Sequence, residues 1–299
     1  MKIAVLMSTY NGEHYIKEQI DSILAQAGDF TLELWVRDDG SRDGTMDILT
    51  QYAEAGKLRW YTGENRKPAH SFMDLLLNCP EYDYYAFADQ DDFWMPDKLA
   101  SGISQLQAQK GPALYCANAE LVDHHLDSLG RCVYKRSPRL DLPTLSCAGD
   151  LLGCTMVFNA PLAQLLQSRP MPGAMVMHDF YLALVCLLAG GNILYDPTPR
   201  MLYRQHGANV VGASHSRLSA LKSRFRCITR RPPVTVGQQA QTVLAQYPDL
   251  GTPQQRDWLK KLTDSRFFTR LGVACSRQTR YVNKNKSLTL RLAFLLGHR

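Results

Sequence analysis

Apolar and polar positions along the first 120 residues predict strands and helices in alternation. The predicted strands are short apolar runs at residues 3–7, 31–36, 58–61, 84–88 and 113–117. Helices are predicted between them from apolar positions three and four apart, as at Ile16, Ile20 and Ile23. Because alternating strands and helices are typical of βαβ units, this pattern predicts an α/β fold with a mostly parallel sheet.

Helix boundaries are also predicted from local residue types. We expect Ser41 or Asp43 to cap a helix that runs to about residue 55, and Pro96 to stand in the first turn of a later helix. A further helix is expected over residues 71–77.

The pattern changes after about residue 120. A strand is predicted over 151–158, and an apolar helix over 180–189 is opened by His178 and Asp179. A short strand over 193–195 leads into Pro197 and Pro199.

Charge divides the chain unevenly. Residues 214–299 hold 17 Lys and Arg but only three Asp, a net charge of +14, whereas residues 1–213 have a net charge of −8. We therefore expect a first domain over 1–213 and a basic helical region over 214–299 that meets an anionic partner.

Several classes of protein are excluded by the sequence. The longest apolar run, Tyr181–Ala189, is far shorter than the roughly 20 residues of a transmembrane helix, and the first residues do not form a signal peptide. The eight cysteines form no C-x-x-C pair, so we expect reduced thiols in a cytoplasmic protein. The glycine-rich loops that cradle phosphates are absent.

Polar clusters follow three of the predicted strands, at residues 8–11, 38–41 and 89–92. Ligands of parallel sheets bind beyond the carboxyl ends of the strands, so these clusters are expected to share one crevice. Three carboxylates within residues 89–92 suit a hard divalent cation, and an extended segment would point Asp89 and Asp91 to the same side. The alternative is a solvated acidic turn that caps the next helix.

Two further segments contain candidate functional residues. His206 is a candidate metal ligand, and Arg204 beside it is a candidate phosphate contact. Asp179 is a candidate general base at the start of its helix. The alternatives are a polar surface loop around His206 and a plain helix cap at Asp179.

Taken together, these segments resemble the family 2 glycosyltransferases, which have the GT-A (Rossmann-like) fold. The similarity extends over about residues 3–213, and the matching segments occur in the family's order at residues 5–12, 36–45, 87–99, 153–159, 178–184 and 203–212. Asp-Gln-Asp-Asp in 89–92, followed by Trp94 and Pro96-Asp97-Lys98-Leu99, is similar to the bacterial rhamnosyltransferase-like branch.

This resemblance implies roles for the candidate residues. It implies that a nucleoside diphosphate sugar is bound by Thr9, Tyr10, Asp38, Asp39, Asp89 and Arg204. It also implies that Asp91 and His206 ligate Mg²⁺ or Mn²⁺, and that Asp179 is the catalytic base. One departure lies in residues 65–72, where Lys67 and Ser71 stand in place of the usual Gly and Asn.

The activity implied by the resemblance is an inverting, metal-dependent transfer of a single sugar. The expected reaction moves L-rhamnose from dTDP-L-rhamnose to a lipid-linked or growing bacterial surface glycan of O-antigen or capsule type. Alternatives are a UDP-hexose or UDP-N-acetylhexosamine donor, and a non-catalytic nucleotide-sugar-binding module. No residue visibly distinguishes thymine from uracil.

The basic region suggests where this activity takes place. Residues 217–231 hold six basic residues, with apolar positions at helical spacing, and 288–296 is a second apolar stretch. Basic amphipathic helices lie on anionic membranes, so we expect peripheral attachment to the inner face of the plasma membrane. The alternative is that these helices pack on the catalytic domain. No nucleic-acid-binding motif is present, so nucleic acid is not an expected partner.

Overall fold

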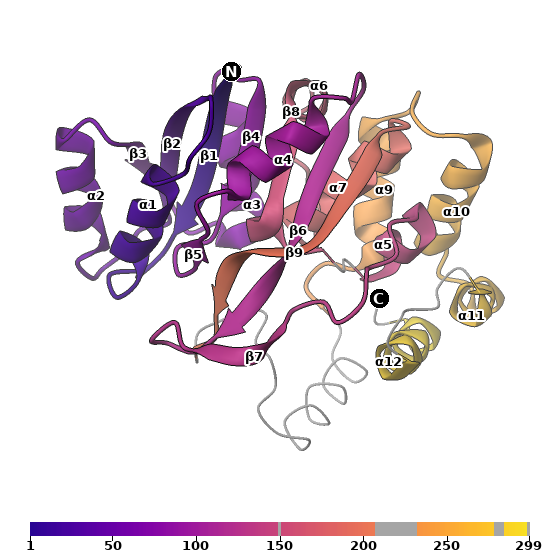
Figure 1. Cartoon of the computed structure of the whole chain (residues 1–299). Helices are drawn as coiled ribbons and strands as arrows, with labels where there is room; N and C mark the ends of the chain where they lie inside the picture. Colours follow the sequence, from indigo (N-terminus) through magenta and orange to yellow (C-terminus); the bar gives the residue numbers. More distant parts are fainter. Residues whose placement is uncertain (149–150, 207–231, 278–283, 298–299) are drawn as a thin grey trace. The chain divides into compact units, whose positions relative to one another are not determined.

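The computed structural model describes residues 1–148, 151–206, 232–277 and 284–297, and the chain divides into two compact units (Figure 1). The first unit comprises residues 1–137, 151–171 and 191–206, and the second comprises 138–150, 172–190 and 207–299. Two segments from the middle of the chain therefore group with the C-terminal residues.

A single sheet organises the first unit. Its strands are β1 (Lys2–Thr9), β2 (Thr31–Asp38), β3 (Arg59–Thr62), β4 (Tyr84–Ala88), β5 (Phe93–Trp94), β6 (Ala113–Val122), β7 (Ser128–Cys132), β8 (Met156–Asn159) and β9 (Asn192–Arg204). Over the described residues the order is β3-β2-β1-β4-β8-β6-β9-β5, with β7 paired to β6.

Strand directions confirm the predicted α/β class. Strands β3, β2, β1 and β4 run parallel to one another, and β6 runs parallel to β9. Strand β8 is antiparallel to both of its neighbours, and β5 is antiparallel to β9. Strands β1 and β4 are almost wholly buried, as their continuous apolar sequences predict.

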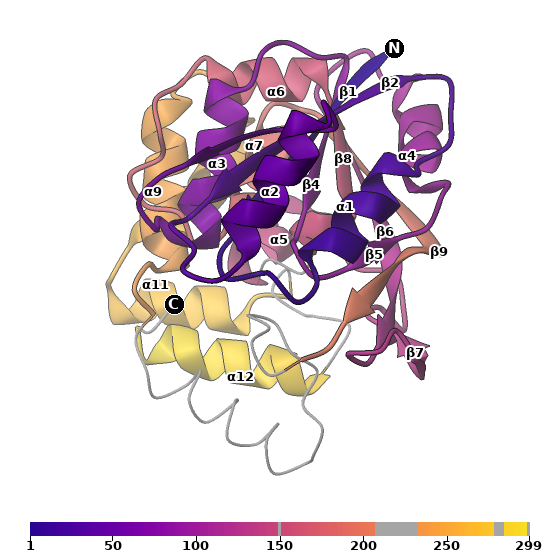
Figure 2. The same ribbon diagram turned by 90° about the vertical axis from the view of Figure 1, so that its left-hand side faces the viewer.

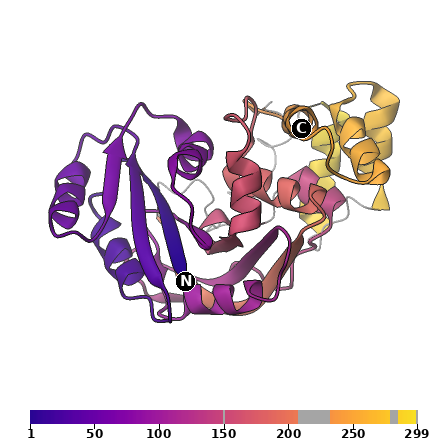
Figure 3. The ribbon, with the colours of Figure 1, turned by 90° about the horizontal axis from the view of Figure 1, so that it is seen from above.

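Helices of the first unit cover this sheet. They are α1 (Ile16–Leu24), α2 (Thr45–Glu54), α3 (Lys67–Asn78), α4 (Lys98–Leu106) and α6 (Ala160–Gln167). Figure 3 shows α3 on the opposite face of the parallel strands from α1 and α2. Right-handed crossovers require this arrangement, because the chain moves outward from β1 to β3 and then returns to β4.

Three local predictions were wrong. The strand expected from residue 151 begins only at Met156, because Gly153–Thr155 forms a 3₁₀ turn in which Thr155 donates two hydrogen bonds to the carbonyl of Leu152. Gly44, and neither Ser41 nor Asp43, is the N-cap of α2. Pro96 precedes the N-cap of α4 and so stands outside its first turn.

Strand β9 is longer than predicted. It continues through Pro197 and Pro199 to Arg204, a residue of the candidate site. The register between β6 and β9 shifts at Ala117–Asn118 and again at Asn118–Glu120. These irregularities accommodate the prolines, which have no N–H to donate to a regular ladder.

Helices form the described part of the second unit. They are α5 (Leu142–Ala148), α7 (His178–Leu188), α9 (Val236–Gln246), α10 (Pro253–Thr263), α11 (Phe267–Cys275) and α12 (Lys284–Leu295). Helix α7 is apolar on nearly all sides and packs against α5 and α9. The predicted amphipathic helix at 217–231 lies outside the described residues. In the part of the chain that the structure describes, no helix is long and apolar enough to span a bilayer.

Candidate active site

The polar ends of β1 and β2 lie side by side, since Thr9 pairs with Asp38 in the parallel register. The buried carboxylate of Asp38 accepts hydrogen bonds from the backbone N–H of Gly40 (2.9 Å) and Ser41 (2.8 Å) and from the Ser41 hydroxyl (2.5 Å). Gly40 has a φ of +79°, which favours glycine. Asp38 therefore fixes the loop that follows β2.

Asp39 belongs to a buried network that the sequence did not indicate. Its carboxylate pairs with the guanidinium of Arg37 and accepts a hydrogen bond from the Ser71 hydroxyl at 2.6 Å. Arg37 also donates to Asp74 at 3.0 Å. Ser71, a departure from the family pattern, thus has a defined partner in Asp39.

Lys67 is the other departure, and its backbone explains the usual glycine. Its φ is +62°, in the left-handed region that glycine adopts most readily. The backbone N–H of Lys67 donates to the Asn65 side chain at 3.1 Å. The turn before α3 therefore has a conformation suited to glycine, although a lysine occupies it.

Gln90 joins the loop after β1 to the loop after β4. Its Oε1 accepts hydrogen bonds from the Thr9 hydroxyl (2.5 Å) and the Tyr10 N–H (2.9 Å), and its Nε2 donates to the Tyr10 carbonyl at 3.2 Å. A Cβ at Gly12 would lie 2.4 Å from Gln90 Oε1. Gly12 therefore leaves the space that this bridge occupies.

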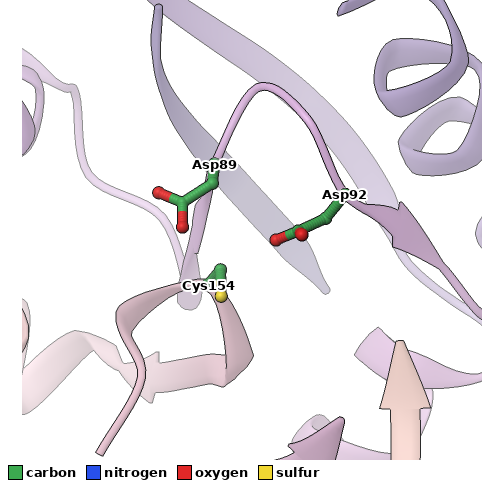
Figure 4. Close-up of side chains that lie close together, drawn as sticks. All are labelled: Asp89, Asp92 and Cys154. Atoms are coloured by element: carbon green, nitrogen blue, oxygen red, sulfur yellow. The ribbon is translucent and has the colours of Figure 1, made fainter. Parts of the chain in front are cut away.

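The acidic loop bends, and its carboxylates separate into two groups. Asp89, Asp92 and Cys154 each have a ligand atom within 4.8 Å of the others (Figure 4). Residues 90 and 91 form a bend, so the expected extended segment is not present. Asp91 instead contacts His206, with its Oδ2 at 2.7 Å from the imidazole Nε2.

Burial controls the charge around Asp92. Its carboxyl is fully buried, so its pKa is raised well above the usual value, and the negative charges of Asp91 and Asp89 add to that rise. Burial likewise raises the pKa of the Cys154 thiol. Nearby positive charge would favour the ionised forms of both groups.

A buried lysine lies close to this cluster. Burial lowers the pKa of Lys98 to about 7, against the opposing influence of Cys154 and Asp92. Its ammonium nitrogen is 3.6 Å from the centre of the Trp94 ring and has no hydrogen-bond partner within the described residues. The family segment 87–99 contains Trp94 and Lys98, but its sequence alone did not indicate this contact.

Arg204 holds the acidic loop in place. Its Nε donates to the Asp91 carbonyl at 2.8 Å, and its backbone N–H donates to Asp92 Oδ1 at 3.1 Å. It also donates from Nη1 to the His124 carbonyl at 2.5 Å, forms an ion pair with Glu18 at 2.5 Å and lies 4.5 Å above the Tyr15 ring. The Tyr15 ring also lies 5.0 Å from the His206 ring, so one aromatic residue packs against both.

The donor atoms of this site suit a divalent cation. Asp89, Asp91 and Asp92 offer carboxylate oxygens, and His206 offers an imidazole nitrogen beside Asp91. Manganese accepts both ligand types, and magnesium prefers the oxygens. The Oδ2 atom of Asp92 is buried without a hydrogen-bond partner among the described residues, which is consistent with a site that gains a cation.

Asp179 belongs to the second unit and is described there. It lies in the first turn of α7, half-buried, and its Oδ1 accepts a hydrogen bond from the N–H of Phe180 at 2.6 Å. The preceding residue, His178, is buried, and burial lowers the pKa of its imidazole to about 3. The Phe180 N–H therefore orients the carboxylate of Asp179, and the residue before it is a buried, neutral histidine.

Comparisons with known proteins find chains of similar sequence and fold. Residues 4–144 match the family model "Glycosyl transferase family 2". Over 226 residues the chain is 27% identical to dTDP-rhamnosyl transferase RfbG of Shigella flexneri, a match that covers 70% of this chain and 75% of the relative.

A second relative differs in its named donor. The chain is 29% identical over 123 residues to the Escherichia coli UDP-Glc:alpha-D-GlcNAc-diphosphoundecaprenol beta-1,3-glucosyltransferase WfgD. That match covers 41% of this chain and 47% of the relative, so the chain spans less than half of that protein.

The fold also matches a solved structure. The mannosyltransferase PcManGT of Pyrobaculum calidifontis, in complex with GDP-Man and Mn²⁺, has a TM-score of 0.53 and 16% identity, covering 99% of this chain and 74% of that one. At this identity the likeness concerns the fold alone. Residues 4–144 thus match the family 2 glycosyltransferases, and the sheet has the fold of a solved glycosyltransferase structure.

Proposed function

We propose that this protein is an inverting, metal-dependent glycosyltransferase that moves L-rhamnose from dTDP-L-rhamnose to a growing bacterial surface glycan. The observation that supports this proposal best is the 2.7 Å contact of Asp91 with His206, beside Asp89 and Asp92 at the carboxyl end of β4. The loops that follow β1 and β2 belong to the same unit and supply polar groups for a nucleotide.

The nucleoside is held by the loops after β1 and β2. Tyr10, which is 45% exposed, offers a ring face to the base, and Thr9 beside it is fixed by Gln90. Asp38 and Asp39 are assigned to the base and ribose, and their bonds to Ser41 and Arg37 keep these loops in shape.

The cation is held by Asp91 and His206, with Asp89 close by. When bound, Mg²⁺ or Mn²⁺ supplies Lewis-acid neutralisation of the charge that develops on the leaving diphosphate. Arg204 positions the loop through the Asp91 carbonyl and the Asp92 carboxylate. We also propose that Arg204 contacts the phosphate groups of the donor, as the resemblance to the family implies.

Asp179 acts as the general base. Its carboxylate takes the proton of the acceptor hydroxyl while that oxygen bonds to the anomeric carbon and the bond from this carbon to the diphosphate breaks. A single displacement of this kind inverts the anomeric centre and releases dTDP. Because the Phe180 N–H orients the carboxylate, Asp179 presents a fixed acceptor for the proton.

A UDP-hexose or UDP-N-acetylhexosamine is the second candidate donor. The relative WfgD is named for a UDP-Glc donor and a diphosphoundecaprenol-linked acceptor, whereas RfbG is named for dTDP-rhamnose. We favour dTDP-rhamnose because the RfbG match covers more of both chains. In either case we propose a lipid-linked or growing glycan as acceptor, at the cytoplasmic face of the membrane.

Calorimetric titration of dTDP, UDP and GDP, each with and without Mn²⁺ or Mg²⁺, tests this proposal. We expect binding of dTDP that depends on the metal. A preference for UDP would keep the reaction and replace the donor. If none of the three nucleotides shows metal-dependent binding, the proposal that the protein is a metal-dependent glycosyltransferase is contradicted. A non-catalytic module would then be favoured.

A further inference from the structure

Exposed apolar side chains concentrate on two helices of the second unit. Of the eight large apolar residues exposed in the described part of the chain, five lie on or directly after α11 and α12. They are Phe267 (53% exposed), Phe268 (83%), Leu288 (60%), Leu292 (39%) and Leu296 (55%). We call these five residues the α11–α12 surface. Large exposed apolar patches mark interaction sites, because water solvates them poorly.

The two helices are neighbours. Figure 2 shows α11 and α12 side by side. The side chain of Arg291 on α12 donates to the carbonyl of Ser276, which caps α11, at 3.4 Å. Arg270 of α11 likewise adjoins Gly297, which follows α12. The exposed residues of both helices therefore belong to one packed pair.

Each helix has a buried side and an exposed apolar side. On α12, Leu290, Ala293 and Phe294 are buried, whereas Leu288, Leu292 and Leu296 recur at intervals of four and are exposed. A spacing of four keeps side chains on one face of a helix. Burial within the unit therefore uses one face of α12 and leaves a second apolar face in contact with water.

A hollow between α10 and α11 also has apolar walls. It is lined by Trp258, Phe268, Gly272 and Val273, with the ammonium-bearing Lys261 among the lining residues. Apolar walls and a basic group thus occur together beside Phe268, the most exposed apolar side chain described.

The segments that form α10, α11 and α12 are rich in basic residues. Residues 253–277 and 284–297 hold nine Lys or Arg and two Asp, a net charge of +7. The two acids, Asp257 and Asp264, pair with Lys261 at 2.7 Å and Arg266 at 2.6 Å. Exposed Arg266 directly precedes Phe267 and Phe268. After these two pairs, the remaining charged side chains of these ranges are all Lys or Arg.

We propose that the α11–α12 surface docks on a membrane with anionic head groups. Phenylalanine and leucine side chains enter the boundary between head groups and acyl chains, while the lysines and arginines contact the lipid phosphates. A second copy of the chain is a poorer occupant, because two such surfaces would bring like charges together. Residues 207–231 of this chain are also a poorer occupant of the surface. They hold six basic residues and no acid, so they would be repelled by its positive charge.

This inference rests on the proposed function only in placing a lipid-linked acceptor at the membrane. It assigns membrane attachment to residues of α11 and α12 and not to the predicted helix at 217–231. A lipid surface that holds this unit would keep the enzyme near acceptors that cannot leave the bilayer.

Vesicle co-sedimentation of the full-length chain tests the assignment. Vesicles of phosphatidylcholine are compared with an equal mixture of phosphatidylcholine and phosphatidylglycerol. We expect binding to the mixture, and about tenfold weaker binding for a variant with Phe267→Ser and Phe268→Ser. A second variant, with Leu288→Ser and Leu292→Ser, is expected to show a similar loss. Leu129→Ser is the matched control, since Leu129 is an exposed leucine of the first unit.

Three results would overturn the proposal: no binding of the unaltered chain to the anionic vesicles, undiminished binding of both double variants, or equal loss with Leu129→Ser. A dimer in sedimentation analysis that dissociates in the double variants would assign the surface to a second copy instead. Nucleotide titration of the same preparations separates the docking proposal from the proposed enzymatic function. A variant that loses vesicle binding but still binds nucleotide bears only on the docking proposal. Absence of nucleotide binding in the unaltered chain would contradict the proposed enzymatic function.

Discussion

Asp91 and His206 are 115 positions apart in the sequence, yet Asp91 Oδ2 and His206 Nε2 lie 2.7 Å from each other. The contact depends on β9, which passes two prolines by shifts of register and delivers Arg204 and His206 to the loop after β4. Arg204 then fixes the backbone of that loop through the Asp91 carbonyl. The fold thus brings a carboxylate and an imidazole together.

The first prediction concerns this pair. Asp91→Asn removes the negative charge, and His206→Ala removes the nitrogen ligand, so each change weakens metal-dependent nucleotide binding by about 10- to 100-fold. Calorimetric titration of dTDP with Mn²⁺ measures the effect. Asp127→Asn, an exposed carboxylate of the same unit, is the control and is expected to bind normally. Unchanged metal dependence in both site variants would show that the cation binds elsewhere.

The second prediction separates catalysis from donor binding. Asp179→Asn preserves the shape of the side chain but cannot take a proton, so kcat is expected to fall by about 10²- to 10⁴-fold. Nucleotide affinity should stay within the error of the measurement. Release of dTDP from dTDP-rhamnose in the presence of acceptor gives kcat, and calorimetry gives the affinity. Turnover that survives the substitution at normal donor affinity would rule out Asp179 as the base.

The third prediction tests the bridge made by Gln90. In Gly12→Ala, the new methyl group would lie 2.4 Å from Gln90 Oε1 and 3.1 Å from the Thr9 hydroxyl. Gln90 must then leave at least one of its bonds to Thr9 and Tyr10, and we expect nucleotide affinity to fall by about tenfold. Gly111→Ala, where a Cβ has open space, is the matched control.

A double variant shows whether the Gly12→Ala effect arises from this clash. Gln90→Ala removes the clashing atoms and, by itself, also removes the bridge. If the argument is right, Gly12→Ala has no further effect on affinity in the Gln90→Ala background. Additive losses would indicate that Gly12 acts through another contact.

Much of this fold was predictable because its strands are buried on both faces. The apolar runs within β1 and β4 are short and contain no polar residue, which is typical of a strand that is buried on both faces. Residues 151–155 were wrongly assigned to a strand because apolar character does not distinguish a strand from a 3₁₀ turn. The turn depends on a hydrogen bond between Thr155 and the Leu152 carbonyl, which periodicity does not register.

The sequence predicted which residues belong to the candidate site better than it predicted which of their side chains contact one another. Alternation within 89–92 suggested that Asp89 and Asp91 share a ligand, but the bend groups Asp89 with Asp92 and Cys154. The sequence predicts only that Cys154 is a reduced thiol. The Arg37–Asp39 ion pair joins neighbours in sequence, yet its burial depends on Ser71 and Asp74 from α3. Such pairings depend on tertiary packing, which local patterns do not specify.

The last prediction uses the buried histidine before Asp179. Burial lowers the pKa of His178 from 6.5 to about 3 in the folded protein. Above pH 6.5 the imidazole is neutral in both folded and unfolded chains and does not affect stability. Between pH 6.5 and 3 only the unfolded chain takes up the proton, so the free energy of unfolding should fall by about 1.4 kcal/mol for each pH unit.

Denaturant unfolding at pH 7.5 and pH 5 measures this effect in the unaltered chain and in His178→Leu. We expect the variant to lose about 2 kcal/mol less than the unaltered chain between the two pH values, because it has no group to protonate at this position. His14→Leu is the control: the His14 side chain is 79% exposed, and its removal should leave the pH dependence as it was. An equal pH dependence with and without His178 would mean that the imidazole is protonated in the folded protein as readily as in the unfolded chain. In that case burial would not keep the imidazole of His178 neutral, and the stability of this part of α7 would not depend on its protonation.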